Sequence, residues 1–183
     1  MGEVNIKFAK VKPNATIPSK RDEDMGFDIY ACFDKDYILI NPHETKFIPT
    51  GLASACDPGY GFLVFERGST GSKGIARRCG VIDSGYRDEW FICLTNTTNN
   101  KLFISKLNSK ELVEALCIDH ENLIDWKLAE DEVLNAIVYP YSKAIAQALV
   151  VPVPKTKVEE LSYEDLKTIP SERGLGALGS SGK

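Results

Sequence analysis

Four short stretches of the sequence carry charged, amide or hydroxyl side chains in patterns that could bind phosphate or activate water. In ERGSTGSKG, residues 66–74, Arg67 is followed by three glycines, three hydroxyl residues and Lys73. Glycine lets backbone N–H groups turn toward an anion, and arginine and hydroxyl groups complete such a cradle. The stretch is not a P-loop, because Gly74 stands where a magnesium-binding hydroxyl is required. A glycine-rich turn with solvated basic residues is the alternative interpretation.

A second stretch, CGVIDSGYRDEW at residues 79–90, contains a candidate general base. Asp83 follows the apolar pair Val81 and Ile82, and Ser84-Gly85 predicts a tight turn that presents Tyr86. A half-buried carboxylate at a strand end can take a proton from water, and an aromatic ring can form the floor of a sugar pocket. The alternative is a hairpin whose aspartate and glycine serve only the turn geometry.

Two further stretches place one polar side chain in an apolar strand-like run. Asp28 interrupts MGFDIYA, residues 25–31, where a carboxylate is costly unless it is paired or helps to hold a metal-bound water. Gln147 is the one amide side chain of KAIAQAL, residues 143–149, and is a further candidate for such chemistry. The alternative is that it is only a hydrogen-bonded residue of an edge strand. The C-terminal GLGALG matches a dinucleotide-binding spacing, but only four residues follow it, so no such fold can be built.

The elements that must position these side chains are mainly short strands. Apolar, aromatic and β-branched runs at residues 37–40, 45–49, 60–66 and 89–95 are bounded by turn-forming residues, and residues 146–154 are similar. Their near-regular spacing predicts an all-β antiparallel sandwich or barrel.

Residues 98–140 differ in character and predict an acidic, partly helical insertion. Ser109 can cap a helix that begins KELVEALC, and Leu128, Val133, Leu134 and Ile137 have helical spacing. Eight acidic and two basic residues lie between positions 110 and 132. We therefore predict a β core at 1–97 and 141–160, this insertion at 98–140, and a flexible C-terminal arm at 161–183. The polar stretch that follows residue 155 also allows a short helical turn near 158–166.

Composition limits the classes of function. A net charge of −4 and a pI near 5.3 argue against direct nucleic-acid binding. No apolar run is long enough to span a membrane, and the N-terminus is not a signal peptide. Five widely spaced cysteines without a C-x-x-C pair indicate reduced thiols and a cytoplasmic location, and two histidines exclude a multi-histidine metal centre.

The order of the motifs resembles that of the trimeric deoxyuridine triphosphatases (dUTPases). GFDIYA, RGSTGSKG, GVIDSGYRDE, KAIAQ and RGLGALGSSG follow one another between Gly26 and Gly182, and GVIDSGYR is the most specific of them. The resemblance implies a jelly-roll or β-barrel-like fold and a homotrimer whose three active sites are shared between subunits. It also implies Mg²⁺ as cofactor and the reaction of dUTP with water to give dUMP and pyrophosphate, which limits uracil in DNA and supplies dUMP for dTMP synthesis.

The resemblance also implies roles for individual residues. Asp83 would hydrogen-bond the deoxyribose 3′-OH and activate the water that attacks the α-phosphorus, Tyr86 would exclude a ribose 2′-OH, and Asp28 would orient magnesium-bound water. A hairpin between about Ser72 and Asp83 would bind uracil through its backbone. The other residues implied to contact the substrate are Arg67, Gly68, Ser69, Gly80, Val81, Ile82, Gln147, Arg173, Leu178, Gly179, Ser180 and Ser181.

The chain departs from the family pattern at several positions. Gly68 follows Arg67 where the family has serine, Ala144 stands in place of an arginine and leaves Lys143 as a substitute charge, and Asp88 takes a glycine position. Leu178 replaces an aromatic residue that stacks on uracil. Asp83 is retained, so the sequence predicts an active enzyme.

Two alternatives remain from the sequence. A dCTP deaminase shares the fold family but needs an acid or base beside the pyrimidine C4, and no carboxylate other than Asp83 is evidently placed for this. A regulatory protein would act through a partner bound by residues 98–140. Against that second alternative, the insertion could pack its leucines, isoleucines and Trp126 on the barrel and bind nothing.

Overall fold

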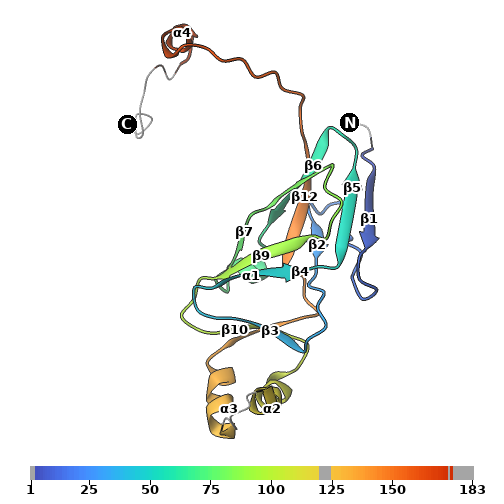
Figure 1. Cartoon of the computed structure of the whole chain (residues 1–183), viewed down its shortest axis with the longest axis vertical. Helices are drawn as coiled ribbons and strands as arrows, with labels where there is room; N and C mark the ends of the chain where they lie inside the picture. Colours follow the sequence, from blue (N-terminus) through green and yellow to red (C-terminus); the bar gives the residue numbers. More distant parts are fainter. Residues whose placement is uncertain (1–2, 120–124, 173, 175–183) are drawn as a thin grey trace.

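The computed structural model describes residues 3–119, 125–172 and 174, which form short β-strands and four helices (Figure 1). The strands are β1 (Ile6–Lys10), β2 (Phe27–Ile29), β3 (Tyr37–Ile40), β4 (Thr45–Pro49), β5 (Leu52–Cys56), β6 (Tyr60–Phe65), β7 (Ile75–Arg78), β8 (Val81–Asp83), β9 (Phe91–Asn96), β10 (Leu102–Ser105), β11 (Ile137–Pro140) and β12 (Ala146–Pro152). The helices are α1 (Gly68–Gly71), α2 (Ser109–Asp119), α3 (Trp126–Leu134) and α4 (Tyr163–Thr168). The predicted strands correspond to β3, β4, β6, β9 and β12.

The strands form four small sheets, and within the described residues these do not close into one continuous barrel. The sheet orders are β2-β12-β6-β8, β4-β9-β7, β11-β10-β3 and β1-β5. Neighbouring strands are antiparallel except for the parallel pair β10 and β11. The all-β prediction is therefore confirmed.

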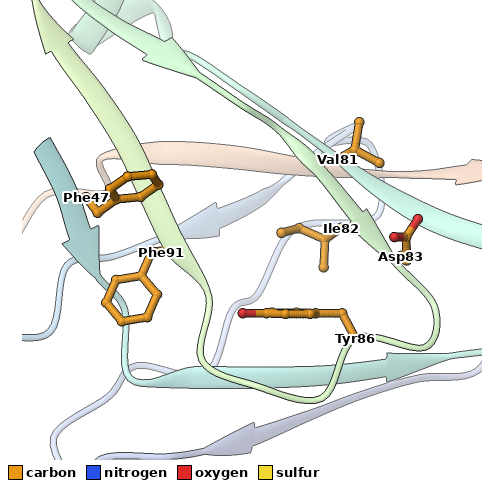
Figure 2. Close-up of a pocket in the computed structure, with 6 residues that line it drawn as sticks. All are labelled: Phe47, Val81, Ile82, Asp83, Tyr86 and Phe91. Carbon is orange, nitrogen blue, oxygen red and sulfur yellow. The ribbon is translucent and has the colours of Figure 1, made fainter. Parts of the chain in front are cut away.

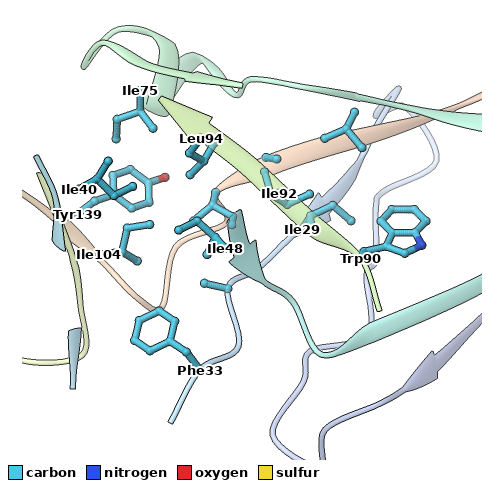
Figure 3. Close-up of a cluster of buried hydrophobic side chains, with 14 of the residues drawn as sticks. Ile29, Phe33, Ile40, Ile48, Ile75, Trp90, Ile92, Leu94, Ile104 and Tyr139 are labelled. Carbon is cyan, nitrogen blue, oxygen red and sulfur yellow. The ribbon is translucent and has the colours of Figure 1, made fainter. Parts of the chain in front are cut away.

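The main core lies between the sheets and fixes the strands that carry the candidate residues (Figure 3). Trp90 is fully buried and packs edge-on against Phe62, with ring centroids 5.0 Å apart. Phe8 of β1 covers the same two rings from outside the main sheets. Each fully buried side chain of this size contributes roughly 1.5–3 kcal/mol, so the core holds β6 and β9 firmly in place.

Part of the segment 98–140 belongs to a sheet. β10 pairs with β3 on one side and β11 on the other, so that Leu102 lies between Ile40 and Ile137. Between β10 and β11, residues 109–119 and 126–134 form α2 and α3, whose buried side chains, such as Leu116 of α2 and Val133 of α3, pack with Phe103 of β10. The acidic segment is thus partly helical, and Figure 1 shows its two helices at the end of the molecule opposite the C-terminal arm.

Two details of the predicted helices are wrong. Asn108, not Ser109, caps α2: its Oδ1 accepts from the Glu111 N–H at 3.1 Å, and Glu111 Oε2 accepts from the Asn108 N–H at 2.8 Å. This reciprocal pair is a capping box, with Ser109 in the first turn. Ile137 lies in β11 rather than in a helix, because pairing with β10 satisfies its backbone in an extended conformation.

The C-terminal arm leaves the sheets after β12. Residues 154–162 are extended and exposed, and they lead to α4, which stands away from the strands in Figure 1. Ser162 caps α4 by accepting from the Asp165 N–H at 3.1 Å. The short helical turn predicted near residues 158–166 is confirmed with bounds Tyr163–Thr168.

No helix within the described ranges is long and apolar enough to cross a membrane. All five cysteines are free. Cys79 is exposed, whereas Cys32 and Cys93 are buried.

Candidate active site

Asp83 ends β8, which is the edge strand of the four-stranded sheet. The strand continues into a turn closed by the Tyr86 N–H, which donates to the Asp83 C=O at 3.1 Å. Asp83 is exposed rather than half-buried as predicted, because no further strand covers this edge. Among the described residues its carboxylate accepts no hydrogen bond and forms no ion pair, so it is available to a substrate or to water.

The turn places the ring of Tyr86 beneath Ile82, as Figure 2 shows. The Tyr86 hydroxyl donates to the Glu89 C=O at 3.0 Å, which fixes the ring orientation. Together with Asp83, these side chains line an open pocket of about 490 Å³ that Phe47 and Phe91 complete at its far side. The pocket is largely apolar, which suits a flat ring and a sugar more than a phosphate chain.

The segment before Asp83 is not a paired hairpin. β7 pairs with β9 while β8 pairs with β6, so the two strands belong to different sheets. Cys79, in the left-handed region with φ of 49°, redirects the chain between them. Gly80 then approaches β6 so closely that its C=O accepts from the Val64 N–H at 2.8 Å. The predicted hairpin is wrong, and the backbone of Gly80 to Ile82 is held by β6 instead.

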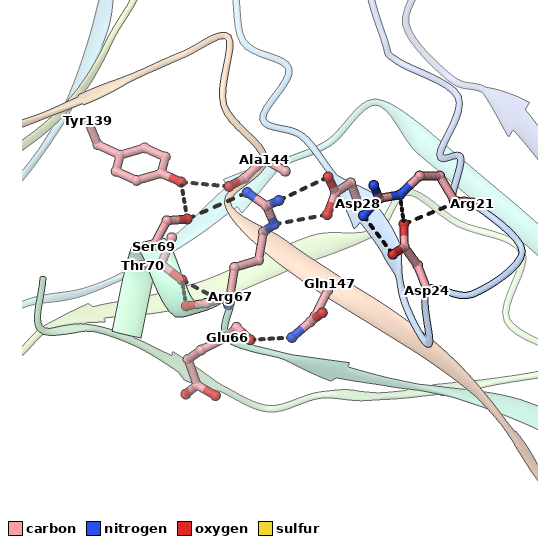
Figure 4. Close-up of polar contacts among 10 residues, drawn as sticks. All are labelled: Arg21, Asp24, Asp28, Glu66, Arg67, Ser69, Thr70, Tyr139, Ala144 and Gln147. Carbon is pink, nitrogen blue, oxygen red and sulfur yellow. Dashed lines mark hydrogen bonds and ion pairs between the residues drawn. The ribbon is translucent and has the colours of Figure 1, made fainter. Parts of the chain in front are cut away.

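Toward the opposite edge of this sheet, where β2 lies, Arg67 and Asp28 form a bidentate ion pair (Figure 4). Arg67 Nε lies 2.9 Å from Asp28 Oδ1, and a terminal nitrogen donates to Oδ2 at 3.1 Å. Arg67 also caps the single turn α1, where its N–H donates to the Thr70 hydroxyl at 3.0 Å. The glycine-rich stretch is therefore a helical turn that presents Gly68 and Ser69 at the surface beside the guanidinium.

A buried tyrosine that the sequence analysis missed supports Ser69. Tyr139 of β11 is almost fully buried, and its hydroxyl donates to the Ala144 C=O at 2.7 Å. Ser69 Oγ lies 3.3 Å from the same hydroxyl and 3.5 Å from an Arg67 nitrogen. Because the tyrosine proton is used by Ala144, Ser69 is the donor to Tyr139. A buried tyrosine usually needs such a partner, but nothing in the local sequence identifies Ser69 as that partner.

Gln147 lies directly opposite Asp28 in the register of β12 and β2. Its Nε2 donates to the Glu66 C=O at 2.8 Å, which leaves Oε1 on the side of Gly26. A Cβ on Gly26 would lie 3.2 Å from that Oε1, so glycine keeps this approach open. Burial would raise the pKa of Glu66, but hydrogen bonds from backbone N–H groups, including that of Arg77, and the nearby Arg77 and Arg78 charges lower it overall.

Asp28, Arg67, Gly68, Ser69 and Gln147 line one polar pocket of about 660 Å³. Its charged side chains are those of Arg21, Arg67, Glu23, Asp24 and Asp28. Two positive and three negative charges do not form a cationic site, so a polyphosphate needs additional positive charge from elsewhere. Within the described ranges no three His, Cys, Asp or Glu side chains group together to hold a metal ion.

The two pockets lie far apart on one chain. Asp83 pairs with Gly61 of β6, whereas Gln147 pairs with Phe65 on the opposite side of the same strand. Four residues along β6 and two strand spacings across it separate their backbones by roughly 16 Å. Arg173, Leu178, Gly179, Ser180 and Ser181 lie outside the described residues, so the structure does not relate them to either pocket.

Comparisons with known proteins agree on one family. The family model described as dUTPase matches residues 12–109, just over half of the chain. A deoxyuridine 5′-triphosphate nucleotidohydrolase of Paraburkholderia xenovorans is 32% identical, covering 86% of this chain and 82% of its own length. The enzyme of the same name from Nautilia profundicola is 29% identical, covering 98% and 100%.

A solved structure shows the same fold. The chain superimposes on a dUTPase of Staphylococcus bacteriophage 80alpha with dUpNHpp, with a TM-score of 0.69 over 98% of this chain and 99% of that one. The two sequences are 21% identical. The jelly-roll-like expectation for the fold is therefore confirmed.

Proposed function

The chain belongs to the dUTPase family, and from this membership we propose that it hydrolyses dUTP to dUMP and pyrophosphate at a site that a single chain cannot complete. The observation that carries the proposal is the separation of the two pockets. A general base must reach the reacting water directly or through one more water, and a gap of roughly 16 Å exceeds that reach. In a homotrimer, Asp83 and Tyr86 of one subunit meet Arg67, Ser69 and Gln147 of the next. The exposed side chains of Phe47, Val81 and Phe91 around the apolar pocket support such an association.

The apolar pocket binds the nucleoside. Tyr86 lies under the deoxyribose, and because its hydroxyl is held by the Glu89 C=O the ring cannot move aside for a ribose 2′-OH. The backbone of Gly80, Val81 and Ile82 contacts uracil. Asp83, which has no partner among the described residues, accepts the proton of the water that attacks the α-phosphorus.

The polar pocket binds the phosphates. Arg67 neutralises phosphate charge, Ser69 donates its proton to a phosphate oxygen in place of Tyr139, and Gln147 adds its amide. Mg²⁺, when bound, supplies the positive charge that the two arginines and three carboxylates of this pocket do not. Asp28, which lines this pocket, would hold the ion through water, and the substrate phosphates would supply its other ligands. We propose that Arg173 and residues 178–181, which lie outside the described residues, close over the nucleotide from a neighbouring subunit.

A substrate panel tests this function. Purified protein with Mg²⁺ is offered dUTP, dTTP, dCTP and UTP, and pyrophosphate release is measured for the wild type and for Asp83→Asn. We expect release from dUTP alone and nearly none from the variant, which keeps the shape of the side chain but not its basicity. Ammonia release from dCTP would identify a deaminase instead, and release from UTP at a similar rate would refute the role of Tyr86.

We also propose a cytoplasmic location without direct contact to membrane or nucleic acid. Five free cysteines suit a reducing compartment, and the net charge of −4 disfavours binding to nucleic-acid phosphates. There the enzyme would limit uracil in DNA and supply dUMP for dTMP synthesis.

A second candidate role belongs to the helical unit formed by α2 and α3. Trp126 and Leu134 are exposed on these helices and line one groove of about 480 Å³ together with Val113 and Val133, and apolar surface gathered in this way marks interaction sites. We propose that this unit binds a protein partner. Replacing residues 106–136 by a flexible linker of about 12 residues, the length that a crossover between the parallel strands β10 and β11 needs, should leave the trimer and dUTP turnover intact if the unit serves a partner, whereas loss of the trimer would mark it as structural.

A further inference from the structure

Two cysteines lie side by side at the edge of the β4-β9-β7 sheet. Arg78 of β7 is the register partner of Cys93 in β9, and Cys79 is the next residue along the chain. One strand spacing and one residue of offset separate the Cα atoms of Cys79 and Cys93 by roughly 6 Å. Disulfides join Cα atoms that are about 4.4–6.8 Å apart, so the backbone positions allow a bond.

The backbone of Cys79 also departs from the regular strand conformation that would carry its side chain away from Cys93. In a regular strand, the residue after Arg78 would point to the opposite face from Arg78 and Cys93. Cys79 has left β7 and lies in the left-handed region, with φ of 49°, which breaks that alternation. The two side chains are close enough that burial and a hydrogen bond with Cys79 both raise the pKa of the Cys93 thiol.

The two thiols differ in access to solvent. Cys79 is exposed, whereas Cys93 is only 5% exposed. We propose that Cys79 and Cys93 form a reversible oxidation site, with Cys79 reacting first and Cys93 closing a disulfide. A peroxide oxidises the Cys79 thiol to a sulfenic acid and is itself reduced to water (or to the alcohol, for an organic peroxide). The Cys93 sulfur then attacks the Cys79 sulfur, an S–S bond forms, and the sulfenic oxygen leaves as a second water.

The bond would act on the nucleoside pocket. Cys79 directly precedes Gly80, whose C=O bonds to Val64 and begins the segment that leads to Asp83. Closing the disulfide pulls Cys79 toward β9 and shifts this segment relative to β6. This consequence rests on the proposed function, and a displacement near the reacting groups predicts a loss of about tenfold or more in kcat/KM for dUTP, restored by a thiol reductant.

Trypsin separates the two cysteines cleanly. It cuts after Arg78, Arg87 and Lys101, so Cys79 lies in the peptide 79–87 and Cys93 in the peptide 88–101. The native protein is treated with hydrogen peroxide, free thiols are alkylated, and the digest is analysed by mass spectrometry. We expect a linked pair of these two peptides that disappears after reduction, and dUTP turnover of the same samples is measured in parallel.

Variants identify the cause of any loss of turnover. Cys79→Ser should turn over dUTP like the reduced wild type and should resist peroxide, whereas Cys117→Ser, in α2, should remain sensitive. Free Cys93 beside over-oxidised Cys79, or a Cys79–Cys79 link between chains, would overturn the proposal, as would equal sensitivity of Cys79→Ser. If the reduced wild type does not hydrolyse dUTP, the proposed function fails, but the peptide map still decides whether the bond forms.

Discussion

Replacing Gly80 by alanine would place a methyl group where the backbone of β6 already lies. The added Cβ would be 2.8 Å from the Val64 C=O oxygen and 2.5 Å from an Arg77 nitrogen. Arg77 is a long side chain that can move, but Val64 lies within a paired central strand. The chain at Gly80 must therefore retreat by about 0.6 Å to reach an ordinary contact of 3.4 Å.

That retreat has two consequences. The hydrogen bond between the Val64 N–H and the Gly80 C=O, now 2.8 Å, lengthens beyond its favourable range, and the overpacking costs about 1–3 kcal/mol of stability. Asp83 moves too, because only three residue pairs hold β8 to β6. Since displacement of about 1 Å near reacting groups can cost roughly a hundredfold in rate, we expect kcat/KM for dUTP to fall between about tenfold and a hundredfold.

Gly85→Ala is the matched control, because no heavy atom lies within 4 Å of the Cβ that it adds. Its free energy of unfolding should stay within about 0.5 kcal/mol of the wild type, with turnover nearly unchanged. Denaturant unfolding and steady-state kinetics on the three proteins test both effects. Wild-type stability and turnover in Gly80→Ala would show that β8 is not held against β6 in the way the structure indicates.

Three further predictions follow from the polar pocket and the arm. Tyr139→Phe leaves the buried Ala144 C=O without its partner, so it should lower the free energy of unfolding by about 1–3 kcal/mol. It also frees Ser69, so it should raise KM more than it lowers kcat. In a Ser69→Ala background the effect on KM should vanish. Glu66→Gln should lower stability by about 1 kcal/mol at neutral pH. The pKa of Glu66 in the folded protein is depressed below its ordinary value of 4.5. The wild type should therefore lose its advantage in free energy of unfolding over Glu66→Gln as the pH falls below 4.5 and then through the folded-state pKa, which pH-dependent unfolding measures. Truncation after Pro170 should leave thermal unfolding unchanged and remove most dUTP turnover, and a fully active truncated enzyme would refute the closing role of the arm.

The sequence predicted the bounds of a strand best where the residues next to that strand end it. The bounds of β3 and β4 agree with the expected runs because Asn41, Gly51 and the flanking polar residues end them locally. The sequence-based prediction failed where pairing with a strand far away in the sequence decides the conformation of a segment. Ile137 fits a helical period equally well, and only its place beside β10 makes it a strand residue. Likewise, a hairpin before Asp83 is locally reasonable, but β7 and β8 find partners in different sheets.

The candidate site was predicted as a set of residues rather than as an arrangement. Asp28, Arg67 and Gln147 meet in one pocket although they lie far apart in sequence. Their common position depends on the pairing of β2, β12 and β6, which no local spacing encodes. For the same reason the sequence could not show that Asp83 lies in a different pocket, nor that Tyr139 supports Ser69.

Complementation between two inactive variants tests the shared site most directly. Asp83→Asn and Arg67→Ala are each expected to be nearly inactive as homotrimers, because every site then lacks one required group. When the two variants are co-expressed, their chains mix at random in the trimers. A site is then intact where its Asp83 comes from an Arg67→Ala chain and its Arg67 comes from an Asp83→Asn chain. About one quarter of the sites meet this condition in a cyclic trimer, so we expect about a quarter of wild-type pyrophosphate release from dUTP. Mixed trimers that remain as inactive as either parent would contradict the shared site.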